Sequence, residues 1–164
     1  MKLKDRVAVV TGASRGIGSC IARRFAAEGA TVAVVARESQ AAADRVAQEI
    51  VSNGGMAKGF QADLTRIHEC KRLAAEVLDT FGAVDILVNN AGVFSARSIE
   101  ETTEDIWDSQ LNLNLKGAFF LTQALVPHMK EKRRGKIINV TSIAGVGDSP
   151  IRPPTALPRA VSSR

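Results

Sequence analysis

The sequence contains no tyrosine, one tryptophan and six phenylalanines among its 164 residues. This aromatic content of 4% argues against a surface that stacks nucleic acid bases, so no nucleic acid partner is expected. Cysteine is also scarce: Cys20 and Cys70 are too far apart for a CxxC metal or redox motif, and we expect both to be reduced thiols. The two histidines, His68 and His128, do not form a metal-ligand pair on one helical face, and no metal site is predicted.

Long apolar runs are missing as well. No segment approaches the roughly 20 apolar residues that cross a bilayer, and the first residues lead directly into a strand-like segment without the apolar core of a signal peptide. We therefore expect a cytoplasmic protein with no membrane partner. The net charge of +5 is a weak indication of an anionic partner, because residues 149–164 hold three arginines and no acidic residue.

Two kinds of segment alternate along the chain, whose 45% hydrophobic and 24% charged residues are typical of one globular domain. Short apolar runs rich in β-branched residues predict buried parallel strands at 7–10, 31–36, 85–88 and 136–140, with a weaker one at 56–62. Helical periodicity separates them, at 18–28, 39–52, 67–81 and 103–132. This alternation predicts an α/β fold: a Rossmann-type doubly wound parallel sheet, incomplete at five strands.

Residues at the ends of the predicted helices agree with this interpretation. Thr65 is expected to cap the helix at 67–81, and Thr103 precedes two acidic residues at a favourable helix start. Gly29 and Gly82 are expected to end helices. Pro127 lies inside the segment 103–132, where it predicts a kink or a stop.

The composition changes after Gly145. Four of the five prolines lie in residues 146–164, which show neither strand nor helix periodicity. We therefore expect a dinucleotide-binding domain over residues 1–145 and an irregular, disordered tail over residues 146–164.

The first residues that indicate chemistry follow the first predicted strand directly. Residues 11–18 read Thr-Gly-Ala-Ser-Arg-Gly-Ile-Gly and open the first predicted helix. Glycines here let the chain turn sharply and let its backbone approach a dinucleotide pyrophosphate closely. The N-terminus of the following helix would stabilise the negative charge of that pyrophosphate. An ordinary tight turn is the alternative interpretation. The candidate cofactor-binding residues of this loop are Gly12, Ser14, Arg15, Gly16, Ile17 and Gly18.

The end of the second predicted strand bears on the choice of dinucleotide. An acidic residue there would bind the ribose 2′-hydroxyl of NAD, whereas this chain has Arg37, with Arg15 nearby in the glycine loop. Two guanidinium groups favour a 2′-phosphate, and we expect NADP(H) in preference to NAD(H). Glu38 weakens that assignment, and a merely exposed arginine is the alternative.

Further motifs follow in order along the chain: Asp63-Leu64, Asn89-Asn90-Ala91-Gly92, Asn114-Leu115-Lys116-Gly117 and Ser142. Together with the glycine loop, they resemble the motifs of the short-chain dehydrogenase/reductase family from about residue 2 to residue 145. The resemblance implies an oxidoreductase that transfers hydride between NADP(H) and a small-molecule carbonyl or alcohol substrate. It also implies a homo-oligomer that pairs through the long helix and the next one, which this sequence lacks.

The resemblance also implies roles for single residues. Asp63 would bind the adenine amino group with Leu64 beside the ring, and Asn90, Ala91 and Gly92 would border the cofactor. Asn114 would hold a water of a proton relay, and Ser142 would polarise the substrate carbonyl, which makes these two the candidate catalytic residues. Local structural roles are the alternatives: Asp63 could cap a loop, and Ser142 could simply end a strand.

The family's proton donor is a tyrosine, followed four residues later by a lysine, and this chain has Thr155 and Arg159 in those places. A threonine hydroxyl is a far weaker acid than a phenol with a pKa near 10. General acid–base catalysis is worth about 10²–10⁴-fold, so we expect impaired turnover. The resemblance further implies that two more strands and the substrate loop are absent, leaving the last strand an exposed edge.

Residues 154–159 suggest an origin for this difference. They can be encoded by bases that, read one position earlier, give Ala-Tyr-Cys-Ala-Ser-Lys, which resembles the family's active-site helix. One hypothesis is a single-base deletion or a sequencing error near codon 153, and a natural variant is the alternative. A non-catalytic dinucleotide-binding module and an unstable product remain alternatives to the enzyme, and the substrate cannot be chosen from the sequence.

Overall fold

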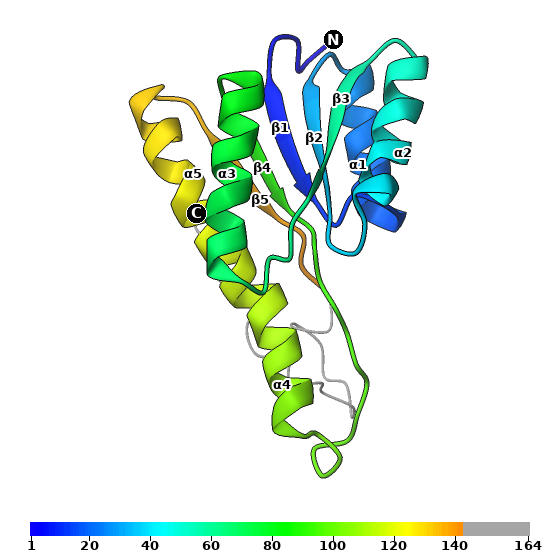
Figure 1. Ribbon diagram of the computed structural model, residues 1–164, viewed down its shortest axis with the longest axis vertical. Coiled ribbons are helices and arrows are strands. Elements are labelled where there is room, and N and C mark those ends of the chain that lie inside the picture. Colours follow the sequence, from blue (N-terminus) through cyan, green and yellow to red (C-terminus); the bar gives the residue numbers. More distant parts are fainter. Residues whose placement is uncertain (143–164) are drawn as a thin grey trace.

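Five parallel strands form the central sheet in the part of the chain that the computed structural model describes, residues 1–142 (Figure 1). They are β1 (Val7–Thr11), β2 (Thr31–Ala36), β3 (Met56–Gln61), β4 (Ile86–Asn89) and β5 (Lys136–Asn139). Their order is β3-β2-β1-β4-β5, and each neighbouring pair is parallel. The predicted strand bounds are confirmed to within one residue at each end. The prediction that the run 136–140 is buried is wrong, because β5 lies at the edge of the sheet and is exposed along its length. The strand order runs outward in both directions from β1, which confirms the doubly wound arrangement.

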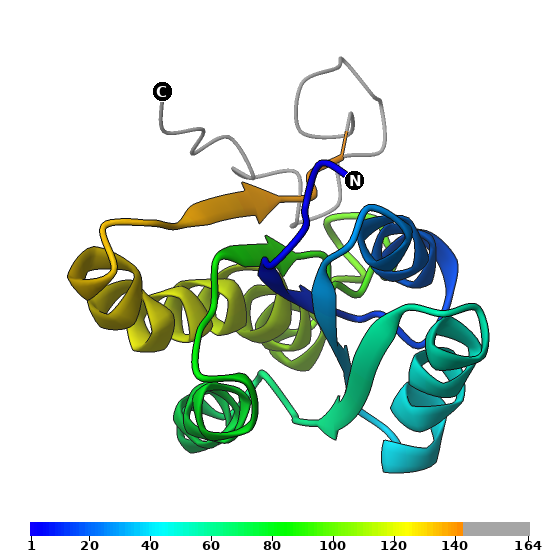
Figure 2. The ribbon, with the colours of Figure 1, turned by 90° about the horizontal axis from the view of Figure 1, so that it is seen from above.

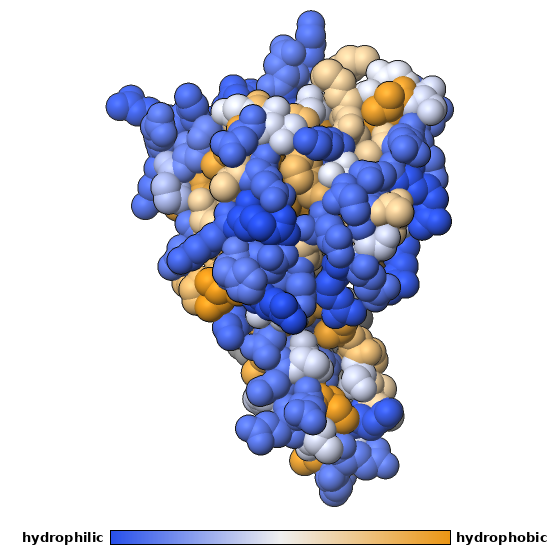
Figure 3. Space-filling model, viewed as in Figure 1, coloured by the Kyte–Doolittle hydropathy of each residue, from blue (hydrophilic) through white to orange (hydrophobic). Residues whose placement is uncertain are grey.

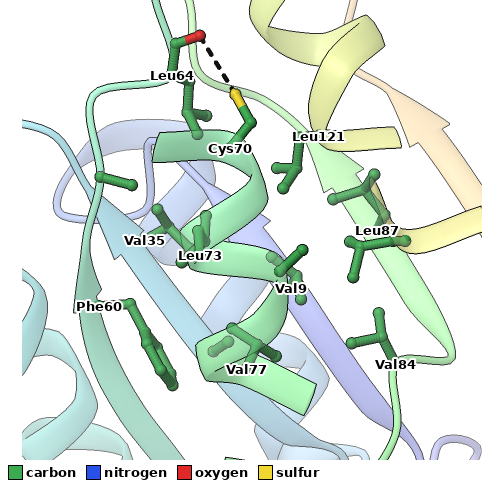
Figure 4. Close-up of a cluster of buried hydrophobic side chains, with 14 of the residues drawn as sticks. Val9, Val35, Phe60, Leu64, Cys70, Leu73, Val77, Val84, Leu87 and Leu121 are labelled. Atoms are coloured by element: carbon green, nitrogen blue, oxygen red, sulfur yellow. Dashed lines mark hydrogen bonds between the residues drawn. The ribbon is translucent and has the colours of Figure 1, made fainter. Parts of the chain in front are cut away.

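Helices cover both faces of this sheet, as Figure 2 shows from above. The helices α1 (Gly16–Ala27) and α2 (Gln40–Ser52) pack on one face through small and β-branched side chains. The opposite face carries α3 (Ile67–Phe81) and α5 (Ala118–Glu131). On that face, Leu73 of α3 and Leu121 of α5 are fully buried against Val9 and Leu87 of the strands (Figure 4). Burial of a leucine side chain contributes about 1.5–3 kcal/mol, so these contacts hold the layers together.

The predicted single helix over 103–132 is wrong in one respect. The structure divides it into α4 (Glu104–Leu111), a π-helical segment η1 (Asn112–Gly117) and α5. Gly117 packs so closely on the turn after β3 that a Cβ at this position would lie 2.5 Å from the carbonyl oxygen of Leu64. The wider π turn therefore occurs where the helix meets the residues that follow β3, and such turns are frequent at functional sites.

Two predictions about helix ends are corrected. Thr65 does not cap α3: the N-cap is Arg66, and the Thr65 hydroxyl instead donates to Asp63 Oδ1 at 2.8 Å. Pro127 does not stop the last helix, which continues to Glu131 because Leu125 and Met129, on either side of the proline, are both buried in the core.

The other predicted ends are confirmed. The Thr103 hydroxyl accepts a hydrogen bond from the amide of Ile106 at 3.3 Å and caps α4. Gly82 ends α3 in the left-handed conformation with φ +73°, and Gly29, with φ +93°, directly follows Glu28, the C-cap of α1. The boundary at residue 145 and the tail over residues 146–164, including Thr155 and Arg159, lie outside the described residues.

Side chains cover part of the free edge of β3. Gln40 Nε2 donates to the carbonyl oxygen of Gly59 at 2.9 Å, and Arg72 Nη2 donates to that of Gln61 at 2.8 Å. Glu69 holds Arg72 in this position at 2.7 Å, and the hydrogen bond from Arg72 lowers the pKa of Glu69. These contacts occupy backbone acceptors that an edge strand otherwise offers to another chain.

Candidate functional site

The predicted cofactor residues gather at the carboxyl ends of the strands, the lower edge of the sheet in Figure 1. A pocket of about 340 Å³ opens there, between the β1–α1 loop, the end of β2, the start of α2, and the residues that follow β3 and β4. Eight of the twelve predicted cofactor residues line it: Gly12, Ser14, Arg15, Arg37, Leu64, Asn90, Ala91 and Gly92. Gly16, Ile17 and Gly18 form the first turn of α1 beside it, with Ile17 exposed to solvent.

The glycines of the β1–α1 loop allow a very close approach of backbone segments. Gly12 and Gly16 have φ angles of +62° and +56°, which other residues rarely adopt. A Cβ at Gly18 would lie 2.4 Å from the carbonyl oxygen of Gly12 and 2.5 Å from Asn90 Nδ2. The loop, the first turn of α1 and the segment after β4 therefore meet with no room for a side chain. The residues present fit a bound pyrophosphate, because the backbone stays open to the ligand at the N-terminus of α1.

Thr11, the last residue of β1, fixes the segment after β4, although the sequence analysis assigned it no role. Its hydroxyl donates to the carbonyl oxygen of Val88 at 3.2 Å and accepts from the amides of Asn90 at 3.0 Å and Ala91 at 2.9 Å. Asn90 Nδ2 in turn donates to the carbonyl oxygen of Thr11 at 2.9 Å and to that of Gly12 at 3.2 Å. One buried hydroxyl thus holds together two walls of the pocket.

Asp63 occupies a different position from the other predicted cofactor residues. Its Oδ1 accepts hydrogen bonds from the amide and the hydroxyl of Thr65, at 3.1 and 2.8 Å. Asp63 borders a neighbouring polar hollow, while Ala62 and Leu64 on either side of it line the pocket. The carboxylate thus caps its own turn, and its contact with an adenine amino group stays a prediction.

Asn89 joins three elements at this end of the sheet. Its Nδ2 donates to Thr122 Oγ1 of α5 at 3.2 Å and to Asn139 Oδ1 of β5 at 2.9 Å. Asn89 and Asn139 are register partners, so the chain leaves β4 and β5 side by side. Ser142 is exposed and lies three residues beyond β5, past the same end of the sheet. Its action on a substrate carbonyl stays a prediction.

Asn114 lies in the π-helical segment η1 and binds the backbone of one residue twice. Its Oδ1 accepts from the amide of Val93 at 2.9 Å, and its Nδ2 donates to the carbonyl oxygen of Val93, also at 2.9 Å. Val93 itself lines the pocket and follows the Asn90–Gly92 wall. The side chain therefore ties η1 to the residues after β4, and a water held by Asn114 stays a prediction.

Replacement of Asn114 by alanine is expected to lower the free energy of unfolding by about 2 kcal/mol, because two partly buried backbone groups of Val93 lose their partners. Chemical denaturation measures this change. Asn112→Ala is the matched control on the same turn, since the Asn112 side chain accepts only a long hydrogen bond from Lys116, at 3.5 Å. Equal losses in the two variants would contradict a specific role for Asn114.

The pocket is lined by one more arginine than the sequence predicts. Arg15 and Arg37 both line it, as predicted, and Glu38 lies beside Arg37 with its carboxylate oxygen 3.3 Å from Arg37 Nη2. A third arginine, Arg45 of α2, also lines the pocket. No motif in the sequence marks Arg45, because it reaches the pocket only through its position one turn after Ala42, another lining residue, on α2.

The described residues hold no group of three or more histidine, cysteine, aspartate or glutamate side chains that could bind a metal ion. Neither cysteine is in a disulfide, and burial raises the pKa of the Cys70 thiol. Within residues 1–142, no helix is both long enough and apolar enough to span a membrane.

Comparison with known proteins places this geometry in a family. The profile of the short chain dehydrogenases matches residues 6–154. A 3-oxoacyl-[acyl-carrier-protein] reductase of Synechocystis sp. is 41% identical over 148 residues, which are 90% of this chain and 60% of that protein. The chain thus spans about 60% of the length of this curated relative.

Two solved structures have a fold similar to that of this chain. A metagenomic short-chain oxidoreductase in complex with NADP is 38% identical, with a TM-score of 0.87 over 95% of this chain and 70% of that one. A gluconate 5-dehydrogenase from Burkholderia cenocepacia J2315, in complex with NADP and tartrate, is 32% identical, with a TM-score of 0.89 over 94% of this chain and 60% of that one.

Proposed function

We propose, from the premise that the chain belongs to the short-chain dehydrogenase family, that its pocket binds a nicotinamide dinucleotide, NADP(H) in preference to NAD(H). The observation that carries this proposal is the contact among Gly12, Gly18 and Asn90, which leaves bare backbone at the N-terminus of α1 where a pyrophosphate would lie. The preference for NADP(H) is supported by Arg15 and Arg37 at the pocket and by the NADP named in two structurally similar complexes.

The proposed reaction is hydride transfer between NADP(H) and a carbonyl or alcohol, and the bound dinucleotide would supply or accept the hydride. Among this chain's own residues, Ser142 would donate a hydrogen bond to the substrate oxygen, and Asn114 would keep the residues after β4 in place against η1. The substrate class we propose is a 3-oxoacyl thioester, on the name of the similar Synechocystis reductase. A cytoplasmic location stays a prediction from the sequence.

A second candidate function follows from the absence of tyrosine in the whole chain. Without a phenol to protonate the carbonyl oxygen, a dinucleotide would be bound but turned over slowly. General acid–base catalysis contributes about 10²–10⁴-fold, so a deficit of that order is expected relative to the Synechocystis reductase. The chain would then act as a dinucleotide-binding module.

Titration of the purified chain with NADPH and NADH, followed by cofactor fluorescence, tests the first part of this proposal. We expect saturable binding with a lower dissociation constant for NADPH. An assay of NADPH oxidation with a 3-oxoacyl thioester then separates the two functions. Saturable binding with turnover at least about 100-fold below that of the Synechocystis reductase supports the binding module, comparable turnover supports the enzyme, and no saturable binding would overturn both.

Homo-oligomerisation is part of the proposal as well. Large apolar side chains are exposed along the lower arm of the molecule, among them Trp107 of α4, Leu115 of η1 and Phe119 of α5. Figure 3 shows hydrophobic surface on the arm that carries α4. Exposed aromatic side chains such as Trp107 and Phe119 are enriched at protein–protein contacts. Light scattering coupled to size exclusion gives the mass, and a monomer at all concentrations would contradict this part.

A further inference from the structure

Arg45 lies on the second turn of α2, and its side chain borders the same pocket as Arg15 and Arg37. Each of the three arginines comes from a different element: the β1–α1 loop, the end of β2 and α2. Among the lining residues within 1–142, Glu38 is the only acidic one. This part of the pocket therefore attracts an anion more strongly than a pair of arginines would.

The position of Arg45 within α2 directs it toward the end of β2. Side chains in a helix lean toward the helix N-terminus, and only three residues separate the N-terminus of α2 from the end of β2. Ala42 lies one turn closer to the N-terminus of α2 and also lines the pocket. Its short side chain does not block the longer side chain of Arg45. The guanidinium of Arg45 can therefore reach toward Arg37 across Ala42.

The ion pairs of α2 leave Arg45 available. Its natural partner in the helix is Glu49, four residues later, but Glu49 Oε2 binds Arg23 of α1, at 2.5 Å from Nη2 and 3.1 Å from Nε. Within residues 1–142, no hydrogen bond or ion pair is formed by the Arg45 side chain. By contrast, Arg37 is paired with Glu38 at 3.3 Å. An arginine without a carboxylate partner loses less on binding a phosphate than one that must first give up its partner.

We propose that Arg45 is a specificity-determining residue that binds the 2′-phosphate of NADP(H) from the side of α2. This inference rests on the proposed function, because it concerns the same pocket and the same ligand. Arg45 supplies the unpaired cation, and Glu38 competes with the phosphate for Arg37. The preference for a 2′-phosphorylated ligand thus depends on a residue nine positions beyond the end of β2, which the dinucleotide-binding motif does not include.

Two small nucleotides test the proposal without the nicotinamide half: adenosine 2′,5′-bisphosphate and adenosine 5′-monophosphate. Calorimetric titration of the whole chain gives the dissociation constant of each. In Arg45→Gln we expect the constant for the bisphosphate to rise about tenfold, as for the loss of one charge-assisted contact, and the constant for the monophosphate to stay within about twofold. In Glu38→Gln we expect tighter binding of the bisphosphate, because Arg37 is released.

Lys130→Gln on α5 is the matched control, since it removes one positive charge from an exposed position of another helix. An equal weakening by Arg45→Gln and Lys130→Gln would show a general charge effect and overturn the proposal. Unchanged binding of the bisphosphate by Arg45→Gln, or equal weakening of both nucleotides, would overturn it too. If the unsubstituted chain binds neither nucleotide nor NADPH, the proposed function itself fails, and this inference with it. Thermal unfolding of each variant verifies that the exposed substitutions leave the fold intact.

Discussion

Gly18→Ala is expected to raise the dissociation constant for NADPH by more than about 100-fold. The added Cβ would lie 2.4 Å from the carbonyl oxygen of Gly12 and 2.5 Å from Asn90 Nδ2, closer than van der Waals contact permits. Gly12 cannot retreat easily, because a Cβ on its own Cα would already lie 2.9 Å from the Cα of Ala91. The loop and the first turn of α1 must therefore separate, which displaces the amides that would face the pyrophosphate.

Gly54→Ala provides the control for this substitution. Gly54, beyond the end of α2, has a φ angle of +81°, but no atom lies within 4 Å of a Cβ placed there. We expect a loss of stability of about 1 kcal/mol from backbone strain and an unchanged dissociation constant. Equilibrium titration with NADPH compares the two variants. Binding by Gly18→Ala within threefold of the unsubstituted chain would show that the close approach at Gly18 does not shape the binding site.

The second large effect is expected at Thr11. Thr11→Val keeps the shape of the side chain but removes the hydroxyl, so the amides of Asn90 and Ala91 lose an acceptor and the carbonyl oxygen of Val88 loses a donor. Unsatisfied groups in a buried place cost about 1–3 kcal/mol each, and Thr11 is 1% exposed. We expect the free energy of unfolding to fall by about 3 kcal/mol, with weaker binding of NADPH as the Asn90 wall loosens.

Thr11→Ser separates the hydroxyl from the methyl group. Serine keeps all three hydrogen bonds and loses one methyl, for which about 1 kcal/mol is expected. Urea denaturation of both variants measures the difference in the free energy of unfolding. The comparison requires that both variants have the same m-value, the slope of that free energy against urea concentration. A loss in Thr11→Val no larger than that in Thr11→Ser would mean that the hydrogen bonds of the hydroxyl contribute little.

The inner strands β1, β2 and β4 were predictable because each is a short apolar run that is almost wholly buried, as Val32, Val34 and Val35 of β2 show. The edge strand β5 was predictable from its β-branched residues although it is exposed. The π-helical segment was not, because nothing in residues 112–117 distinguishes a π turn from an α turn. The wide turn arises where Gly117 meets Leu64, a contact between distant parts of the chain. The prediction at Pro127 was wrong for a related reason. A proline on its own indicates a helix stop, but buried side chains on both sides of Pro127 pack in the core and keep α5 helical past it.

The candidate site was likewise predictable where local sequence specifies the backbone, and not where contacts between distant residues do. The glycine loop and the residues after β4 were predictable, because their types and their places after strands already specify backbone turns at one edge of the sheet. Thr11 was not singled out, because a threonine at a strand end is common and its three partners lie nearly 80 residues away. Arg45 was missed because helix registry, rather than any motif, brings it to the pocket.

The hydrogen bonds from Gln40 and Arg72 to the carbonyl oxygens of β3 also affect how the molecule behaves in crowded solution. A second molecule that adds its own strand at this edge must first break both bonds, which slows the earliest step of β-aggregation. Glu69 keeps its charge, and so its hold on Arg72, below the pH of 4.5 at which an ordinary glutamate is half protonated. The Arg72 part of this protection therefore persists into mildly acidic solution and weakens as the pH falls through the lowered pKa of Glu69, although Glu76 also binds Arg72 at 2.6 Å. The hydrogen bond from Gln40 does not depend on this titration.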